Sequence, residues 1–571
     1  MKNIRFSLML ILSSFFIGAY AQQVANENNR TPATMVWSDE YQEPSNTEIQ
    51  KIIATEGGGF YTLRLHQGGL LNGGKQKPII EFYNSKMKLV RSRELDLGYK
   101  GKDRFLKDVV MVGGRLWMLS YFYNEKHEKT YLFAQEVNKS TLNLTKDMVM
   151  IGEQDETNRE KQDVFSLAQS RDSSKIVIFN RQPNSKDGQS FSLAVYDSEF
   201  TQQWGKEAKL PYGKKNFSVE DYQVDNKGNV YLLGIIYTEG SNRLERRGKA
   251  TYQYDIVAYL KDEAVDVQEY KILLKDKFVT DLTFRIADDG DIVCAGFYSE
   301  KDAKGMKGSC FFKINPHTKD MTSISTREFD FNFVTANLSD RSKMQAKAAV
   351  DRDDKERAPE LFDYSLDKLI MRSDGGVILI AEQYFVEERM LNNNMYGYSP
   401  YGFSPYGLNS WNSPYYSSWN DPYGYRNNRN NRRSDYYFNY NDIIVVNIQP
   451  DGEIAWTTRI PKRQISTNDG GMYSSYAMSI VADKLYFAYN ENPKNLDPNR
   501  TKTVAETPDK YSVVTLAEVA RDGSLKRYPM FSNRDKGVVT RPKICRQVGR
   551  RDMAVYGESG RTYRFGVLSF D

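Results

Sequence analysis

The chain has 571 residues, of which 79 are basic and 74 acidic, so its formal net charge is only +5. This near balance excludes the strong basic excess that nucleic-acid-binding domains carry. The chain has only three cysteines, which excludes a disulfide-dense scaffold, and a large apolar core must therefore hold the fold together.

The first 21 residues have the pattern of a secretory signal peptide. Lys2 and Arg5 form a basic start, Phe6–Tyr20 is apolar, and Ala19 and Ala21 fit an A-x-A cleavage site. The apolar stretch is shorter than the roughly 20 residues of a spanning helix, so we expect cleavage rather than a membrane anchor. No later apolar run is long enough to span a bilayer. We therefore expect a mature chain of residues 22–571 that is exported to the periplasm or the cell surface.

A turn followed by a strand recurs eight times along the mature chain. Each copy has a tight turn rich in Asp, Asn and Gly, followed by β-branched and aromatic residues. Such turns supply the positive φ angles of a hairpin, and the apolar run predicts a strand buried on both faces. The base period is about 60 residues. The copies are Glu56–Leu63, Val112–Leu119, Asp172–Ile178, Asn226–Leu233, Asp289–Gly296, Asp374–Ala381, Ala482–Ala488 and Arg551–Gly557.

Other strands fill the intervals between these copies. A strand such as Asp281–Ile286 precedes each turn, and two more follow, as in Pro78–Tyr83 and Leu89–Leu95. Each repeat therefore has four strands, which is the content of one propeller blade. Since an isolated blade cannot bury both of its faces, neighbouring blades must pack on one another.

The two ends of the chain complete the pattern. The last repeat contains only about three strands, within 543–570, while a spare strand, Thr34–Glu40, precedes the first repeat and resembles Ile454–Thr458. If this strand completes the last blade, the ring closes and no long edge stays exposed. We therefore predict an all-β fold: a β-propeller of about eight four-stranded blades, closed by the N-terminal strand. The alternatives are an open solenoid, which needs capping repeats, and two stacked β domains split near residue 335.

Two insertions account for the two longest intervals between turns. Residues 337–363 are predicted to be helical, with Ser339 as the N-cap, good helix formers over Lys343–Val350, and Pro359 as the end. This helix packs on the propeller in the simplest interpretation, or serves as a lid or docking element. Residues 391–437 are rich in Tyr, Asn, Pro and Gly, and we predict a disordered loop there.

The disordered loop supplies the candidate binding residues. Exposed Tyr, Trp and Arg are typical contact residues, and aromatic rings stack on sugars. The alternatives are a tolerated low-complexity expansion and an arm for single-stranded nucleic acid, which export and the weak net charge disfavour. The candidates are Tyr401, Tyr406, Trp411, Trp419, Arg429 and Arg432.

Catalytic and metal-binding patterns are sparse in this sequence. The three histidines, His66, His127 and His317, have no metal-ligand spacing, and no glycine-rich turn has the phosphate-binding pattern. We therefore assign no catalytic residue, no metal and no cofactor. Cys294 and Cys310 fall on adjacent strands of one predicted hairpin, where they either pair or remain buried thiols.

Three segments carry a family resemblance: Leu366–Tyr384, Asn441–Ile448 and Ser474–Ala477. The chain resembles secreted β-propeller-like proteins of Bacteroidota-type bacteria, which have no assigned function. The resemblance covers roughly residues 30–571, with its sharp motifs after residue 360. It implies an exported propeller and supplies no catalytic residues.

The functional expectation is a non-enzymatic binding or scaffold protein of the bacterial cell envelope. Its partner is an envelope protein or a glycan, recognised through propeller loops, with no nucleic acid and no membrane span. One alternative is a carbohydrate-active enzyme with its site at the mouth of the propeller channel. Another is a structural envelope component that the disordered loop anchors.

Overall fold

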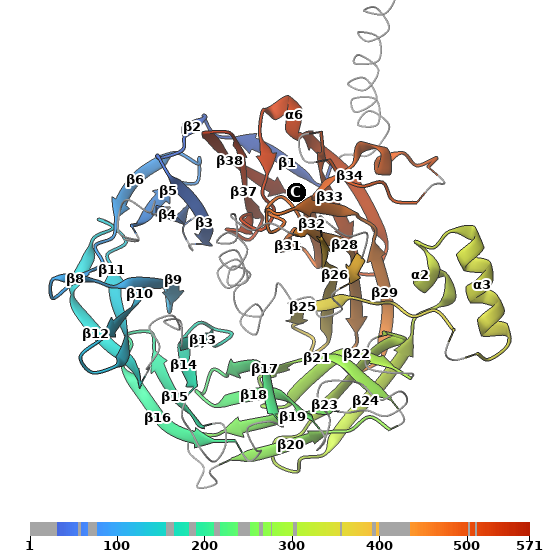
Figure 1. Ribbon diagram of the computed structural model, residues 1–571, viewed down its shortest axis with the longest axis horizontal. Helices are drawn as coiled ribbons and strands as arrows, with labels where there is room; N and C mark the ends of the chain where they lie inside the picture. The colour runs from blue at the N-terminus through green and yellow to red at the C-terminus, as the bar shows by residue number, and fades with distance from the viewer. Residues whose placement is uncertain are drawn as a thin grey trace, which may run out of the picture.

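The computed structural model shows a ring of antiparallel sheets around a central axis, which is the predicted β-propeller with eight blades (Figure 1). It describes residues 31–571 except 55–56, 58, 67–76, 156–164, 182–189, 211–216, 238–251, 262–266, 276, 301–304, 355–356, 391–395, 399–433, 501–502 and 509–510. The predicted signal peptide, residues 1–21, lies outside the described residues. Among the described helices, none has the length and apolar character needed to cross a membrane.

Blades 1 to 5 each consist of four strands that are consecutive in the chain, the first of them next to the axis. Blade 1 has β3 (Thr47–Ala54), β4 (Phe60–His66), β5 (Pro78–Tyr83) and β6 (Leu89–Glu94); blade 2 has β9 (Phe105–Val112), β10 (Arg115–Asn124), β11 (Lys129–Val137) and β12 (Leu144–Asp155); blade 3 has β13 (Phe165–Gln169), β14 (Lys175–Arg181), β15 (Ser190–Asp197) and β16 (Gln202–Lys209). Blade 4 has β17 (Phe217–Val224), β18 (Val230–Tyr237), β19 (Tyr252–Tyr259) and β20 (Gln268–Ile272); blade 5 has β21 (Phe278–Ile286), β22 (Ile292–Ser299), β23 (Gly308–Ile314) and β24 (Met321–Glu328).

Blades 6 to 8 carry additional short strands. Blade 6 has β25 (Tyr364–Met371), β26 (Val377–Met390), β28 (Ser434–Ile448) and β29 (Ile454–Ile460), with β27 (Tyr396–Tyr398) and β30 (Gln464–Thr467) at its margins; blade 7 has β31 (Ala477–Val481), β32 (Lys484–Glu491), β33 (Val513–Val519) and β34 (Leu525–Ser532). Blade 8 has β35 (Val539–Thr540), β36 (Arg546–Gln547), β37 (Asp552–Ser559), β38 (Thr562–Phe570), β1 (Ala33–Trp37) and β2 (Tyr41–Gln42). The hairpin β7 (Gly98–Tyr99) and β8 (Lys102–Asp103) joins blades 1 and 2, η2 (Pro493–Leu496) follows β32, and α6 (Asn533–Lys536) follows β34.

The N-terminal strand closes the ring, as predicted from the spare strand that precedes the first repeat. β1 pairs antiparallel with β38, with Ala33 opposite Phe570 and Trp37 opposite Gly566. The pairing extends one step further, because the N–H of Asp571 donates to the carbonyl of Pro32 at 3.0 Å. The edge of β38 is therefore covered.

The recurrent turns lie between the first and second strands of the blades, as predicted. In blade 4 the N–H of Gly228 donates to the carbonyl of Asp225 at 3.1 Å, and in blade 5 that of Gly290 donates to Ala287 at 3.0 Å. Gly228 and Gly290 have φ values of 95° and 96°, which a glycine adopts at little cost. Blades 4 and 5 thus share one turn geometry.

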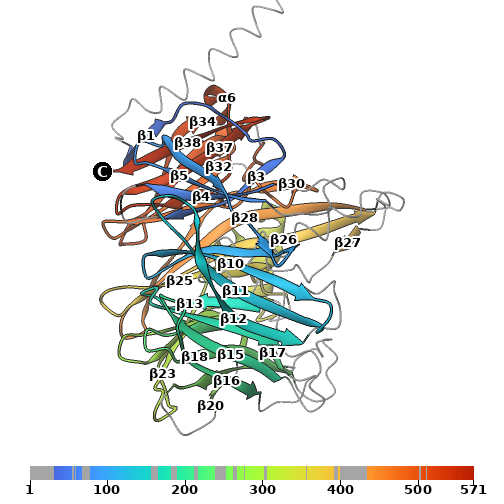
Figure 2. The same cartoon turned by 90° about the vertical axis from the view of Figure 1, so that its left-hand side faces the viewer.

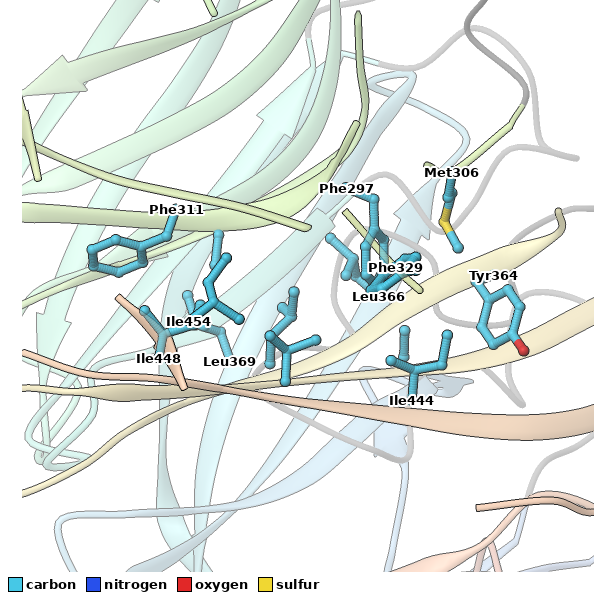
Figure 3. Packing of buried hydrophobic residues seen from close by; sticks show 14 of the residues in the cluster. Phe297, Met306, Phe311, Phe329, Tyr364, Leu366, Leu369, Ile444, Ile448 and Ile454 are labelled. Carbon is cyan, nitrogen blue, oxygen red and sulfur yellow. The ribbon is translucent and has the colours of Figure 1, made fainter. Parts of the chain in front are cut away.

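Buried apolar side chains fill every interface between neighbouring blades in the described part of the chain. Between blades 5 and 6, Phe297 packs near Leu366 and Ile444 (Figure 3). Between the last blade and the first, the rings of Phe60 and Phe565 lie 5.1 Å apart. Because blades 5 and 6 flank residue 335 and share one core, the chain does not divide into two stacked β domains there.

The insertion between blades 5 and 6 forms two helices on the outside of the ring (Figure 1). They are α2 (Phe331–Thr335), which the sequence did not predict, and α3 (Asp340–Asp351). The N-cap of α3 is Ser339, whose Oγ accepts the N–H of Ser342 at 3.2 Å. Pro359 does not end α3, contrary to the prediction. The helix stops well before it, because Asp353 already adopts a φ of 52°.

Strands β26 and β28 run past the body of the ring and form a projecting arm (Figure 2). Residues 391–395 and 399–433 of the predicted loop lie outside the described residues. Its last residues do not continue the loop, because Tyr436 and Tyr437 pair with Glu388 and Glu387 in the arm. The sheet therefore extends into the segment whose composition predicted a loop.

The three cysteines are free and buried, and no disulfide joins Cys294 to Cys310. Cys310 lies opposite Gly296 in the hairpin, while Cys294 lies opposite Phe312. The two thiols are thus out of register by two residues. Of the two options that the sequence left open, Cys294 and Cys310 are therefore buried thiols, which pack as small apolar groups.

Candidate functional site

Residues from opposite sides of the ring meet around the axis and enclose a cavity of about 450 Å³, which we call the channel mouth. Its wall comes from the turns after the first strands of blades 3, 4 and 5, from the end of β25 in blade 6, and from β36 in blade 8. A cavity of this size is typical of small-molecule pockets. The charged residues in its wall are Arg171, Asp225, Lys227, Arg285, Asp288 and Arg546.

Three arginines reach the channel mouth from three different blades. Arg171 comes from the first turn of blade 3 and lies 3.6 Å from the carboxylate of Asp288 in blade 5. Arg285, at the end of β21, donates from Nη1 to the carbonyl of Phe284 at 3.1 Å. Arg546 of blade 8 donates from Nη1 to the carbonyl of Ile52 in blade 1 at 3.3 Å. The closed ring is what brings these three guanidinium groups around one cavity.

Contacts between neighbouring inner strands hold this wall in place. The amide of Gln223 in blade 4 donates to the carbonyl of Phe284 in blade 5 at 2.5 Å, next to Arg285. Asp281 in blade 5 accepts the N–H of Leu366 in blade 6 at 3.1 Å. Such bonds fix the spacing of the blades at the axis and keep the lining residues in one arrangement.

The two lining carboxylates already have partners. Asp225 Oδ1 accepts the N–H groups of Lys227 and Asn229 at 2.9 Å and 2.8 Å, and Oδ2 accepts the side-chain amide of Asn229 at 2.8 Å. Asp288 is 85% exposed and faces Arg171. Asp225 therefore builds the turn. Among the described residues there is also no group of three or more His, Cys, Asp or Glu that could hold a metal ion.

Positive charges crowd this end of the channel. Burial lowers the pKa of the Arg285 guanidinium, the carboxylate of Asp221 opposes this effect, and the charge of Arg171 lowers the pKa further. In blade 1, burial lowers the pKa of Lys51, its ion pair with Asp108 opposes this, and Arg546 lowers the pKa further. Arg171 and Arg546, in the wall of the channel mouth, thus each lower the pKa of another cationic side chain.

Asp221 lies behind the wall, next to Arg285, and is buried in β17. Its Oδ1 accepts the N–H of Tyr222 at 2.8 Å, and its Oδ2 accepts the amide of Gln223 at 3.2 Å. Burial raises the pKa of Asp221 to about 7, although Arg285 and these hydrogen bonds act in the opposite direction. This carboxyl therefore titrates near neutral pH.

We expect Asp221 to make the free energy of unfolding fall as the pH rises from about 4 to 7. The unfolded chain loses this proton near the ordinary pKa of 3.8, whereas the folded protein keeps it until about pH 7. The unfolded state binds fewer protons in this window, so stability falls with rising pH, by up to about 4 kcal/mol. Denaturant midpoints of the wild type and of Asp221→Asn between pH 4 and 8 measure the effect.

The Asp221→Asn variant should lack this part of the pH slope, because it has no proton to lose. Asp147→Asn, at an exposed position on β12, is the control and should keep the slope of the wild type. Equal slopes in the wild type and in Asp221→Asn would show that Asp221 ionises at its ordinary pKa.

A second polar cluster lies in the interior, around Lys462 and Glu382. Lys462 Nζ lies 2.5 Å from Glu382 Oε1, and both side chains are fully buried. Ser475 Oγ donates to Glu382 Oε2 at 2.7 Å, and the N–H of Lys462 donates to Asp442 Oδ1 at 3.0 Å. The cluster ties the segment between β29 and β31 to blade 6. It has no solvent-facing group that a ligand can reach, so we assign it a structural role.

None of the three histidines lines the channel mouth. Tyr401, Tyr406, Trp411, Trp419, Arg429 and Arg432 all lie outside the described residues. His66 is half-buried at the end of β4, while His127 and His317 are exposed in turns. The sequence analysis missed Arg171, Arg285 and Arg546. Charged residues beside the recurrent turns were the available signal, because a closed ring brings these turns to one end of the channel.

Comparison with protein-family models and with curated proteins found no match. Among solved structures, the β-propeller domain of the Trilobed protease from Pyrococcus furiosus, with an open velcro topology, is similar at 10% identity and a TM-score of 0.33, over 86% of this chain and 97% of that chain. A protein of unknown function from Bacteroides caccae has 10% identity and a TM-score of 0.25, over 67% of this chain and 90% of its own. The endo-arabinase from Bacteroides thetaiotaomicron has 13% identity and a TM-score of 0.22, over 39% of this chain and 74% of its own. The fold is established by the blades themselves, and these distant similarities assign no activity.

Proposed function

We propose that the protein is a non-enzymatic binding protein of the bacterial cell envelope and that it holds its ligand at the channel mouth. The cavity of about 450 Å³, enclosed by residues from five blades, carries the proposal. Because the ring is closed by its own strands and packed cores, this cavity is formed before any ligand arrives. The signal-peptide pattern of residues 1–21 supports an envelope location.

The carbohydrate-active alternative needs a pair of carboxyl groups that face each other across a sugar. At the channel mouth, both oxygens of Asp225 accept hydrogen bonds within its own turn. Asp288 is exposed and faces the cation of Arg171 at 3.6 Å. These arrangements favour binding over hydrolysis.

The projecting arm is the second element of the proposed function. Strands β26 and β28 carry both ends of the segment 391–433 away from the ring. The candidate contact residues of that segment, Tyr401 to Arg432, remain a prediction for recognition of a larger partner. The channel mouth and the arm are separate features, so variants can test them independently.

The test is to fill the cavity and measure binding and turnover together. Lys227 lines the mouth and is exposed in its turn, so Lys227→Trp should fill the cavity without disturbing a blade. Lys126→Trp places the same ring on an exposed turn of blade 2 and is the matched control. Purified variants are screened against peptides, glycans and polysaccharides from the cell envelope. We expect Lys227→Trp alone to lose the ligand, with no product formed by any variant.

Two results would contradict this proposal. Ligand binding that is equal in Lys227→Trp and Lys126→Trp would place the site away from the channel mouth. Turnover of a polysaccharide by the wild type, lost in Lys227→Trp, would establish the enzymatic alternative instead.

A further inference from the structure

We infer that the channel mouth binds the carboxyl terminus of a short peptide, with Arg171, Arg285 and Arg546 around the carboxylate and the aliphatic wall of blade 6 against the last side chain. This inference rests on the proposed function, because it names the ligand class of the same site. It follows from three features of the cavity: its charge, its apolar side and its size.

The charge of the wall favours a ligand with a carboxylate. Four of the six charged lining residues are cations, and three of these are arginines from blades 3, 5 and 8. A guanidinium group binds a carboxylate through two parallel N–H donors, a geometry that lysine does not offer. Asp225 is engaged within its turn, so Asp288 is the one lining carboxylate that faces an arginine of the mouth. A bound anion would relieve the repulsion between Arg171 and Arg285.

Part of the lining of the cavity is aliphatic. Leu369, Ile370 and Met371 at the end of β25 line the mouth together with Ile286. Branched and flexible apolar side chains of this kind accept the side chain of a peptide residue. Other lining residues carry amide and hydroxyl groups, from Gln169, Ser173 and Asn226, which match the N–H and C=O groups of a peptide backbone.

The size of the cavity and the residues that line it together restrict the chemical class of ligand that can bind there. A cavity of about 450 Å³ admits a few residues and excludes a folded domain. Among the lining residues that the structure describes there is no aromatic ring, so these residues offer no platform on which a nucleobase or a sugar ring stacks. A peptide end with an apolar last residue therefore fits the wall better than a nucleotide or a saccharide does.

The experiment compares three probes, of which the two peptides differ in one group. The first is N-acetyl-Ala-Ala-Leu with a free carboxylate, the second is the same peptide as its C-terminal amide, and the third is trigalacturonate, which supplies carboxylates on sugar rings. Calorimetric titration of the full mature protein gives each dissociation constant. We expect the free-acid peptide to bind at least about tenfold more tightly than its amide, because the charge-assisted hydrogen bonds are lost in the amide. This preference should shrink as the salt concentration rises.

Two charge variants test the role of Arg171, whose side chain is half exposed and therefore replaceable without loss of the core. Arg171→Gln should remove most of the preference for the free acid, by about tenfold, and Arg171→Lys should restore only part of it. Asp288→Asn removes the opposing charge and should tighten binding of the free acid a few-fold while leaving the amide unchanged.

The outcomes separate this inference from the proposed function. Equal binding of acid and amide, still lost in Lys227→Trp, would overturn the peptide-carboxylate inference and leave the mouth as the binding site. Tighter binding of trigalacturonate than of the peptide would identify a saccharide as the occupant. Binding that survives Lys227→Trp would overturn the proposed function itself. The absence of binding by all three probes at millimolar concentration would overturn the inference as well.

Discussion

Replacing Lys462 by methionine is expected to lower the free energy of unfolding by about 3–5 kcal/mol. Methionine keeps most of the volume and the flexible stem of lysine, so the change removes the charge and the hydrogen bonds that Nζ donates to Tyr440 and Gln464. Glu382 would then stay fully buried and lose the ammonium group that lies 2.5 Å away, while it keeps the hydroxyl of Ser475 and the electrostatic attraction of Lys543. A buried carboxylate that loses its nearest cation costs far more than the loss of one hydrogen bond. Denaturant unfolding, followed by tryptophan fluorescence, gives the change in midpoint.

Two further variants make this prediction specific. Lys129→Met removes a cation from an ion pair with Glu153 at the surface, and its expected cost is below about 1 kcal/mol. Lys462→Met combined with Glu382→Gln removes both charges of this ion pair and should recover a large part of the stability. The buried-charge explanation is falsified if Lys462→Met costs no more than Lys129→Met.

The Lys462 cluster also brings the three segments that carry the family resemblance together in space. Glu382 lies in the first segment, Asp442 in the second and Ser475 in the third. In the structure their side chains meet around Lys462, which none of the three segments contains. The three segments are far apart in the chain, and each was recognised from its own residues. The side-chain contacts that join them form only when the blade is folded.

The architecture could be predicted because its signals are local. Each turn with Asp and Gly needs a positive φ at a fixed position, as at Gly228 and Gly290, and each following strand is apolar on both faces. The closure by β1 followed from counting strands in the last repeat. Such patterns depend on neighbours within about ten residues, so a single sequence displays them.

The channel mouth could not be predicted in the same way. Arg171, Arg285 and Arg546 are each separated by more than 100 residues and converge only because the ring closes. Composition also failed at the arm, where pairing with β26 keeps Tyr436 and Tyr437 in a strand. In the helical insertion, the φ of Asp353 ended α3 before the proline was reached. In each case a tertiary or backbone constraint outweighed the local residue preference.

Removing the N-terminal strand is expected to cost at least about 5 kcal/mol and to cause self-association. A mature chain that begins at Glu43 lacks β1 and β2, so the whole edge of β38 becomes exposed. The truncation also removes Trp37, whose ring lies 5.1 Å from that of Phe531, and Tyr41, which stacks on Tyr563 at 5.4 Å. Size-exclusion chromatography and denaturant midpoints, compared with a chain that begins at Arg30, give the two effects.

A pair of neighbouring substitutions tests whether closure depends on packing as well as on strand pairing. Met35 packs toward the core between blades 7 and 8, while Val36 points outward and is 60% exposed. Met35→Asp brings a carboxylate against that core and should cost about 3 kcal/mol, whereas Val36→Asp should stay within about 0.5 kcal/mol of the wild type. Both variants leave the backbone hydrogen bonds of β1 available. Equal and small costs would mean that the strand pairing alone closes the ring, and equal and large costs would mean that the outer edge of blade 8 is itself covered.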